Sequence, residues 1–357
     1  MLSNYSNYLS VFIASLFFSL KVPAQIHKIS SLNLVDFSKT KDFIYNFYAY
    51  NNFFHLIGDN KKYILNSEGQ LIGIDTLQII EYKKRKIGLY KSVNNNKTDI
   101  YVENDRKILV CNNGTIKNEI SLGKEQSGRQ IEEIEEDNNN NVYVIHQENI
   151  FDVLAPHLIY VTKIDTKDNF KQTRYILPFR NAWLDEEHRF KVADTIAIFN
   201  NSKFTKDEKE VTNCQQELIV TNTTTFDTLK TLNIDAQLKL KSRWEKTRII
   251  WFNGKTCLFV TTCLDNNGNK DVVGMANIDK GTITKIIEYK LPLKPKKDAL
   301  NKNINVKIGE AASYYRYFNE PNGISYSFEK NYLFVLYVTS GLVTIDTYSL
   351  KDYFKNF

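Results

Sequence analysis

The sequence is poor in residues that punctuate or cross-link a chain, with 14 glycines, 6 prolines and 4 cysteines in 357 residues. So few cysteines exclude a disulfide scaffold, in which bridges take the place of a large core. There is no Cys-x-x-Cys pair and no His/Cys cluster, so we expect no metal site and no cofactor. The composition is 42% hydrophobic and 25% charged, which is typical of a globular rather than a disordered chain.

Two short motifs of large enzyme classes are also missing. No Gly-x-Ser-x-Gly segment is present, so the sequence gives no support for a serine hydrolase of that kind. No glycine-rich phosphate loop is present either. If the chain is an enzyme, its chemistry must come from residues without such a motif.

The longest hydrophobic run lies near the N-terminus. Leu9–Leu20 is a 12-residue uncharged segment, too short to span a bilayer and typical of a signal-peptide core. Val22 and Ala24 suit positions −3 and −1 of a cleavage site before Gln25. The segment "MLSNYSNY" has no Lys or Arg, so a buried N-terminal helix or strand is the alternative.

These features predict a signal peptide over 1–24 and one soluble domain over 25–357, exported to the periplasm or the exterior. No cysteine follows the hydrophobic run, which argues against a lipoprotein anchor. No other run is long enough to cross a membrane. We expect a monomer.

An exported chain permits disulfides, but their pairing stays open among Cys111, Cys214, Cys257 and Cys263. Cys257 and Cys263 lie in "TCLFVTTCL", which is typical of one strand, and six strand residues span about 20 Å. These two cannot bridge each other. Bridges across strands or free buried thiols remain the alternatives.

Aromatic residues are abundant, with 21 Tyr and 22 Phe, which favours strands. An Asn or Asp that ends an apolar run and begins a polar turn recurs at intervals of 46 to 67 residues. The six positions are Asn66, Asn112, Asp165, Asn222, Asp279 and Asp346. Their side chains cap turns and tolerate left-handed geometry, so each indicates a hairpin between two strands.

Each hairpin follows another β-rich run, such as "FFHLIG", "NVYVIHQ" or "YLFVLYV". A repeating unit of this length with about four strands is typical of a propeller blade, because sheets packed in a ring bury faces that a lone sheet leaves exposed. We therefore predict an all-β protein, a β-propeller of six four-stranded blades, with seven blades as the alternative. A pair of β-sandwiches is the competing architecture.

The turns "NSEGQ", "NNGTIK" and "DKGTIT" and the segment "EEDNNNNVYVI" resemble those of secreted six-bladed β-propellers common in Bacteroidota. The resemblance covers about residues 30–357 and implies architecture rather than chemistry. The segment 26–37 lacks a complete unit, so we expect it to pair with the last blade and close the ring.

Two segments carry candidate ligands or catalytic groups. "AWLDEEHRF" contains Trp183, Asp185, Glu186, Glu187 and His188, which suit a carbohydrate or acid–base site, although a solvated loop is the alternative. "DNNGNKD" (265–271) alternates oxygen ligands, but its glycine is misplaced for an EF-hand, so a hairpin turn is favoured.

In the blade model, the connections between successive blades all lie on one face of the ring. Each contains Lys or Arg, and two contain Trp, which predicts a basic face that attracts an anionic partner. The candidate contacts are Arg180, Trp183, His188, Arg189, Arg243, Trp244, Lys296 and Lys297. Outside the cytoplasm such a partner is an acidic polysaccharide or protein rather than nucleic acid.

The sequence therefore favours a binding or scaffolding module over an enzyme. The alternative is a glycan hydrolase or lyase with Asp185, Glu186, Glu187 and His188 at the channel mouth. A coordinate structure separates the two, because an enzyme needs acids from several blades to converge.

Overall fold

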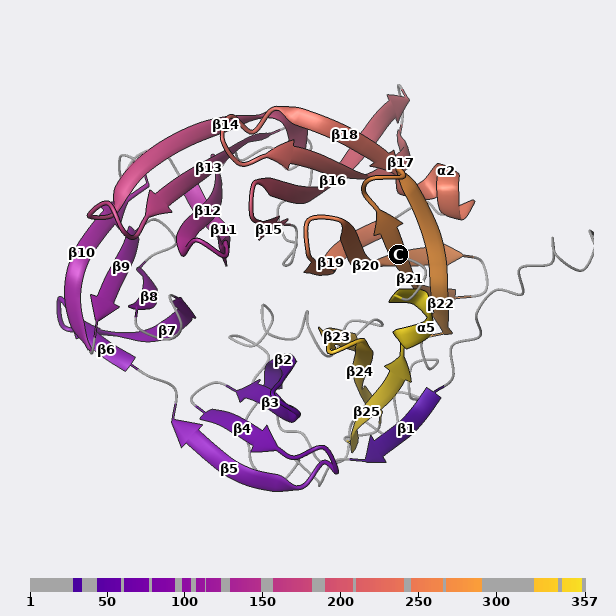
Figure 1. The fold of residues 1–357 in the computed structure, drawn as a ribbon, viewed down its shortest axis with the longest axis horizontal. Helices are drawn as coiled ribbons and strands as arrows, with labels where there is room; N and C mark the ends of the chain where they lie inside the picture. The colour runs from indigo at the N-terminus through magenta and orange to yellow at the C-terminus, as the bar shows by residue number, and fades with distance from the viewer. Residues whose placement is uncertain are drawn as a thin grey trace, which may run out of the picture.

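The computed structural model forms a closed ring of six β-sheets around a central axis, a six-bladed β-propeller (Figure 1). The structure describes residues 28–33, 44–58, 61–76, 79–93, 98–103, 107–112, 114–122, 129–148, 157–181, 190–207, 210–240, 245–265, 268–290, 324–339 and 342–354. The predicted fold class is confirmed, with six blades rather than seven.

The strands of each blade follow one another from the centre of the ring outward (Figure 1). Blade 1 contains β2 (Ile44–Tyr50), β3 (Phe53–Gly58), β4 (Lys61–Leu65) and β5 (Leu71–Thr76). Blade 2 contains β7 (Arg85–Val93), β8 (Thr98–Glu103), β9 (Lys107–Asn112) and β10 (Thr115–Ser121), with an additional strand, β6 (Ile79–Tyr82), paired to β7. Blade 3 contains β11 (Arg129–Glu136), β12 (Asn141–Glu148), β13 (His157–Asp165) and β14 (Lys171–Asn181).

The remaining blades continue the same order. Blade 4 contains β15 (Phe190–Ala193), β16 (Ile196–Asp207), β17 (Glu210–Asn222) and β18 (Thr228–Asn233), followed by the short helix α2 (Ile234–Leu238). Blade 5 contains β19 (Glu245–Phe252), β20 (Thr256–Asp265), β21 (Gly268–Asn277) and β22 (Thr282–Lys290). Blade 6 contains β23 (Ile324–Glu329), β24 (Tyr332–Thr339), β25 (Leu342–Ser349) and, from the other end of the chain, β1 (Lys28–Asn33); α5 (Lys351–Phe354) follows β25.

The turns between the two outer strands use the predicted Asn and Asp side chains. The Oδ1 atoms of Asn66, Asp165 and Asn222 each accept backbone N–H groups from residues two to four positions further on. In blade 5 the capping residue is Asn277, whose Oδ1 accepts the N–H of Lys280 at 2.8 Å. Asp279 lies within that turn rather than at its start, so the predicted start of this turn is two residues too late.

The ring is closed by the first strand of the chain, as predicted for segment 26–37. β1 pairs antiparallel with β25 (Figure 1). Asp346 does not begin a turn; it lies inside β25 with 2% of its surface exposed. Its carboxylate accepts the Ser31 hydroxyl at 2.7 Å and lies 2.7 Å from the Lys28 ammonium group. Tyr289 of blade 5 lies 3.4 Å from the same carboxylate.

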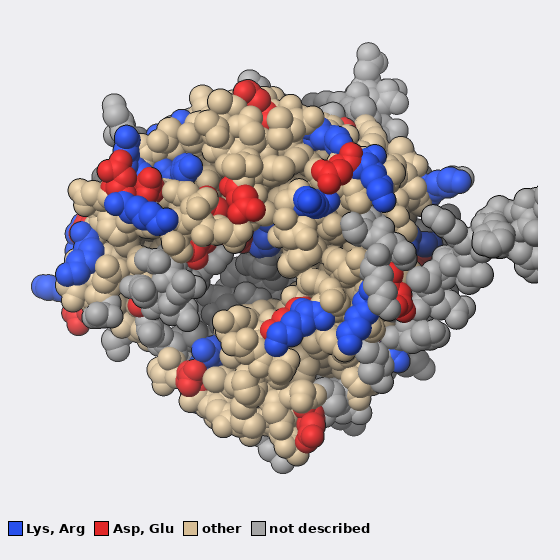
Figure 2. All heavy atoms as spheres, in the orientation of Figure 1, with Lys and Arg blue, Asp and Glu red and all other residues tan. Residues whose placement is uncertain are grey.

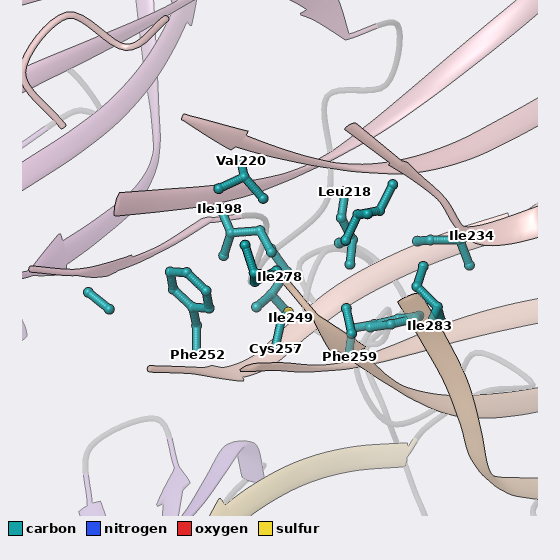
Figure 3. Packing of buried hydrophobic residues seen from close by; sticks show 13 residues of the cluster. Ile198, Leu218, Val220, Ile234, Ile249, Phe252, Cys257, Phe259, Ile278 and Ile283 are labelled. Atoms are coloured by element: carbon teal, nitrogen blue, oxygen red, sulfur yellow. The ribbon is translucent and has the colours of Figure 1, made fainter. Parts of the chain in front are cut away.

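The hydrophobic core lies between facing blades. Figure 3 shows the largest cluster, in which Ile198 and Leu218 of blade 4 pack against Ile249 and Phe259 of blade 5. Within blade 5, Gly274 pairs with Phe259 across β20 and β21. Their packing is so close that a Cβ atom added at Gly274 would lie 2.4 Å from Cζ of Phe259.

Because every blade is antiparallel, its turns alternate between the two faces of the ring. The turn face carries the hairpin turns 51–52, 66–70, 138–140, 166–170, 194–195, 223–227, 253–255, 278–281 and 330–331. The opposite, connection face is where β14 ends at Asn181 and where the inner strands β15, β19 and β23 begin at Phe190, Glu245 and Ile324.

Candidate functional site

Of the candidate residues that the sequence singled out, the structure describes only Arg180. Arg180 lies in β14, where its backbone pairs with Leu158. The other candidates lie outside the described residues: Trp183, Asp185, Glu186, Glu187, His188, Arg189, Arg243, Trp244, Lys296 and Lys297. The next described strands after these candidates along the chain are β15, β19 and β23.

A cluster of two acids and one lysine lies where β15 begins. Glu133 and Glu135 lie on β11, the innermost strand of blade 3, and Lys191 on β15, the innermost strand of blade 4. The ammonium group of Lys191 lies 3.2 Å from Oε1 of Glu133 and also contacts Oε1 of Glu135. The backbone N–H of Phe190 donates to Oε2 of Glu133 at 3.0 Å.

The strand pattern explains why both acids point at blade 4. Residues two apart share one face of a strand, so Glu133 and Glu135 project together. The intervening Ile134 projects the other way, into the core that blade 3 shares with blade 2. The acidic run is therefore half of an inter-blade contact rather than a solvated stretch.

Burial sets the protonation of this cluster. Removal from water raises the pKa of Glu133 to about 7, the nearby Glu135 carboxylate adds to the increase, and the Lys191 ammonium group opposes it. Burial lowers the pKa of Lys191, but the two carboxylates outweigh burial and hold that pKa above its usual value. Near neutral pH Lys191 therefore stays charged while Glu133 exchanges a proton.

This arrangement can do two things chemically. It joins the inner strands of blades 3 and 4 through a charged side chain and a backbone hydrogen bond. It also places a carboxyl group that titrates near neutral pH beside a second carboxylate, a combination suited to general acid–base chemistry. The side chains of Glu133, Glu135 and Lys191 are 10%, 14% and 20% exposed, so the cluster is accessible only at its edge.

A second charged cluster joins blades 5 and 6. Asp271 on β21 is fully buried, and its carboxylate accepts the hydroxyls of Thr262, at 2.7 Å, and Tyr326. Arg248 on β19 lies 3.6 Å from the same carboxylate and 5.6 Å from the centre of the Tyr326 ring. Burial raises the pKa of Asp271, while Arg248 and the two hydroxyls oppose the rise. Because both oxygens have close partners, this cluster serves the blade contact.

The candidate calcium segment "DNNGNKD" forms a hairpin, as favoured from the sequence. Asp265 ends β20, Gly268 begins β21, and the two residues pair across the turn. Among the described residues, no group of three or more His, Cys, Asp or Glu side chains is placed to hold a metal ion.

Cys257 is a free, buried thiol, and Cys111 is also buried. Cys257 and Cys263 lie in the single strand β20, as predicted. In the part of the chain that the structure describes, no helix has both the length and the apolar character needed to cross a membrane.

Sequence reasoning missed Glu133, Glu135 and Lys191. From the sequence alone, the run "IEEIEED" (131–137) indicates no more than local acidic charge. The alternation of Ile and Glu could have identified a strand with one acidic face. The lysine partner could not have been found in the same way, because it lies 58 residues further along the chain.

Comparison with known proteins identifies no family, and no curated protein matches the chain. Among solved structures, an oligogalacturonate lyase in complex with manganese is 11% identical, covering 84% of this chain and 85% of that one, with a TM-score of 0.44. An oligogalacturonate lyase from Vibrio parahaemolyticus is 10% identical, covering 91% and 98%, with a TM-score of 0.46. The WD40 domain of Neurospora crassa Pan2 is 8% identical, covering 86% and 75%, with a TM-score of 0.41. Likeness at this level carries no information about activity or substrate.

Proposed function

We propose that the protein is a binding or scaffolding module that holds an anionic glycan or acidic protein on its connection face. One observation carries the proposal. The segments that contain the candidate Arg, Lys and Trp residues lead into β15, β19 and β23, the inner strands of three successive blades. These three strands lie side by side around the centre of the ring (Figure 1).

The two faces differ in composition. The turn face is built largely from Asn, Asp and Thr, as in 138–140 and 223–227. On the connection side, Lys83, Lys84 and Arg85 are exposed at the start of β7, and Lys239 is exposed after α2. Figure 2 shows acidic and basic side chains mixed over the described surface of one face, so the described part of that face is not strongly basic. The cationic excess required by the proposal belongs to the connections.

Binding to immobilised alginate and heparin tests the proposal. Arg243→Ala and Trp244→Ala should weaken binding at least about tenfold, a loss of ~1.4 kcal/mol, whereas Lys167→Ala and Lys280→Ala, exposed on the turn face, should not. Raising NaCl from about 0.05 M to about 0.5 M should weaken binding by the unchanged protein, because salt screens exposed charges. Equal loss in both pairs of variants, or binding indifferent to salt, would overturn the proposal.

The proposal includes export, with cleavage after Ala24. Expression of the full chain in a bacterium with a periplasm should yield a mature protein beginning at Gln25, identified by mass spectrometry of the intact chain. A cytoplasmic chain that retains residues 1–24 would contradict this part of the proposal.

A second candidate function, a glycan hydrolase or lyase, is favoured by the Glu133–Glu135 pair. Both carboxylates contact one ammonium group, so their oxygens lie within about 6 Å of each other, inside the range used by paired catalytic carboxylates. The segment with Asp185, Glu186, Glu187 and His188 leads directly into Phe190 beside this pair. Release of reducing ends or unsaturated sugars, lost in Glu133→Gln, would establish this function; glycan binding without turnover would exclude it.

A further inference from the structure

One junction in the ring differs from the other five. At five junctions a single hydrophobic cluster contains residues of both neighbouring blades; these are the junctions between blades 2 and 3, 3 and 4, 4 and 5, 5 and 6, and 6 and 1. Among the described residues, no cluster joins blade 1 to blade 2. The face of blade 2 turned toward blade 1 packs instead with its own strand β6, through Ile80 and Tyr82.

The face of blade 1 turned toward blade 2 carries a row of aromatic rings, the blade 1 wall, formed by Tyr48, Tyr50, Phe53 and His55. Tyr48 pairs with His55 and Tyr50 pairs with Phe53 across β2 and β3, so all four side chains project from one face of this hairpin. The opposite face of the hairpin, with Phe47 and Phe54, packs on blade 6.

The wall is exposed, although its residues are large and aromatic. Tyr48 and Phe53 are each 38% exposed, and Tyr50 is 58% exposed. Tyr48 lies flat on the His55 imidazole, with ring centroids 4.6 Å apart and an angle of 11° between the planes. The four side chains span about 7 Å along the strands, which is the rise of two residues. His55 is buried beneath Tyr48 and fixes its orientation.

The polar groups beside the wall are balanced in charge. Lys62 and Asp75, on β4 and β5 of the same blade, form an ion pair at 3.1 Å. Burial lowers the pKa of His55, and the Lys62 charge acts in the same direction, so the imidazole is neutral near pH 7. The wall therefore offers aromatic ring faces, and the Lys62–Asp75 pair beside it adds a donor and an acceptor without net charge.

We propose that the blade 1 wall is a binding site for a neutral saccharide. The C–H face of a sugar ring packs on an aromatic ring, while its hydroxyl groups need donors and acceptors beside that ring, here Lys62 and Asp75. A purely apolar partner would bury this ion pair without compensation. An anionic ligand would meet the Asp75 carboxylate, which is 56% exposed. A neutral polyhydroxylated ring satisfies both the apolar and the polar parts.

Isothermal titration calorimetry of the full chain with cello-, xylo-, manno- and maltohexaose tests this site. At least one of these sugars should bind, and Tyr48→Ala and Tyr50→Ala should each weaken its binding at least about tenfold, equivalent to ~1.4 kcal/mol. Matched controls are Ile176→Ala and Leu229→Ala, which remove exposed apolar side chains elsewhere and should leave binding unchanged. Because Tyr50 is more than half exposed, its variant should fold normally even if Tyr48→Ala does not.

The effect of salt distinguishes this site from the basic site proposed above for an anionic ligand. Neutral sugar binding should persist at about 0.5 M NaCl and in Arg243→Ala, since neither charge attraction nor Arg243 contributes to it. The proposal fails if none of the four sugars binds, or if binding is equal in the tyrosine and control variants. Binding of a proline-rich peptide in place of sugars would assign the wall to a protein partner and would also overturn it.

Discussion

Replacing Glu133 by Gln should raise the free energy of unfolding at alkaline pH. At acid pH the variant and the unchanged protein should be almost equally stable. Glutamine keeps the shape of the side chain and the amide oxygen that can accept the Phe190 N–H, but it cannot ionise. The substitution therefore removes only the charge that burial penalises. Lys191 keeps Glu135 as its partner.

The sign follows from the direction of the shift. The pKa of Glu133 rises from 4.5 in the unfolded chain to about 7 in the folded protein, so between these values the folded state binds more protons. The free energy of unfolding therefore falls as pH rises through this interval. The shift corresponds to a loss of at most about 3 kcal/mol, fully present above pH 7 and absent near the unfolded pKa. Glu133→Gln should recover up to that amount at about pH 8 and almost nothing at about pH 4.5.

Denaturant unfolding at a series of pH values measures this difference. Glu68→Gln is the matched control, because Glu68 is exposed in a hairpin turn and its replacement should give the same small change at every pH. A Glu133→Gln chain whose stability relative to the unchanged protein does not vary with pH would refute the reasoning. A relative loss of stability at alkaline pH would show that the charged form of Glu133 is favoured, because the attraction of Lys191 then exceeds the cost of burial.

Three further predictions concern packing and closure. Asp346→Asn should lower the free energy of unfolding by about 1–3 kcal/mol, because it weakens charge-assisted contacts that hold β1 to β25, and denaturant unfolding measures the loss. Gly274→Ala should cost about 1–3 kcal/mol or more through collision with the Phe259 ring, whereas Gly73→Ala, with no atom closer than 3.9 Å, should cost far less; thermal unfolding separates them, and equal losses would contradict the geometry. Cys257 should react with a thiol reagent only after unfolding, because its sulfur is buried and burial raises its pKa; rapid labelling of the native chain would contradict this.

The fold was predictable because its repeating signals are local. Asn66, Asp165 and Asn222 were recognised as turn residues, since an Asn or Asp side chain caps the backbone a few positions away. The same logic places the start of the blade 5 turn at Asp279, which is two residues too late, because Asn277 caps that turn. It failed for Asp346, whose partners come from a strand at the opposite end of the chain.

The candidate sites were less predictable, because they depend on which blades meet. Glu133 looks like one of several acids in "IEEIEED" until β15 brings Lys191 against it. Tyr48 and Phe53 look like core residues of a strand-rich protein. Only the three-dimensional structure shows that, within the described part of the chain, their junction lacks the shared core that the other five possess.

The pairing of β1 with β25 also fixes the order of events during folding. Ser31 and Asp346 are separated by 315 positions, so the loop that must close before they meet is nearly the whole chain. Every other blade is complete within one continuous segment and can form as soon as that segment is available. The first strand must wait for the last one, which makes closure of the ring the final step and sets its timing by completion of the C-terminal blade.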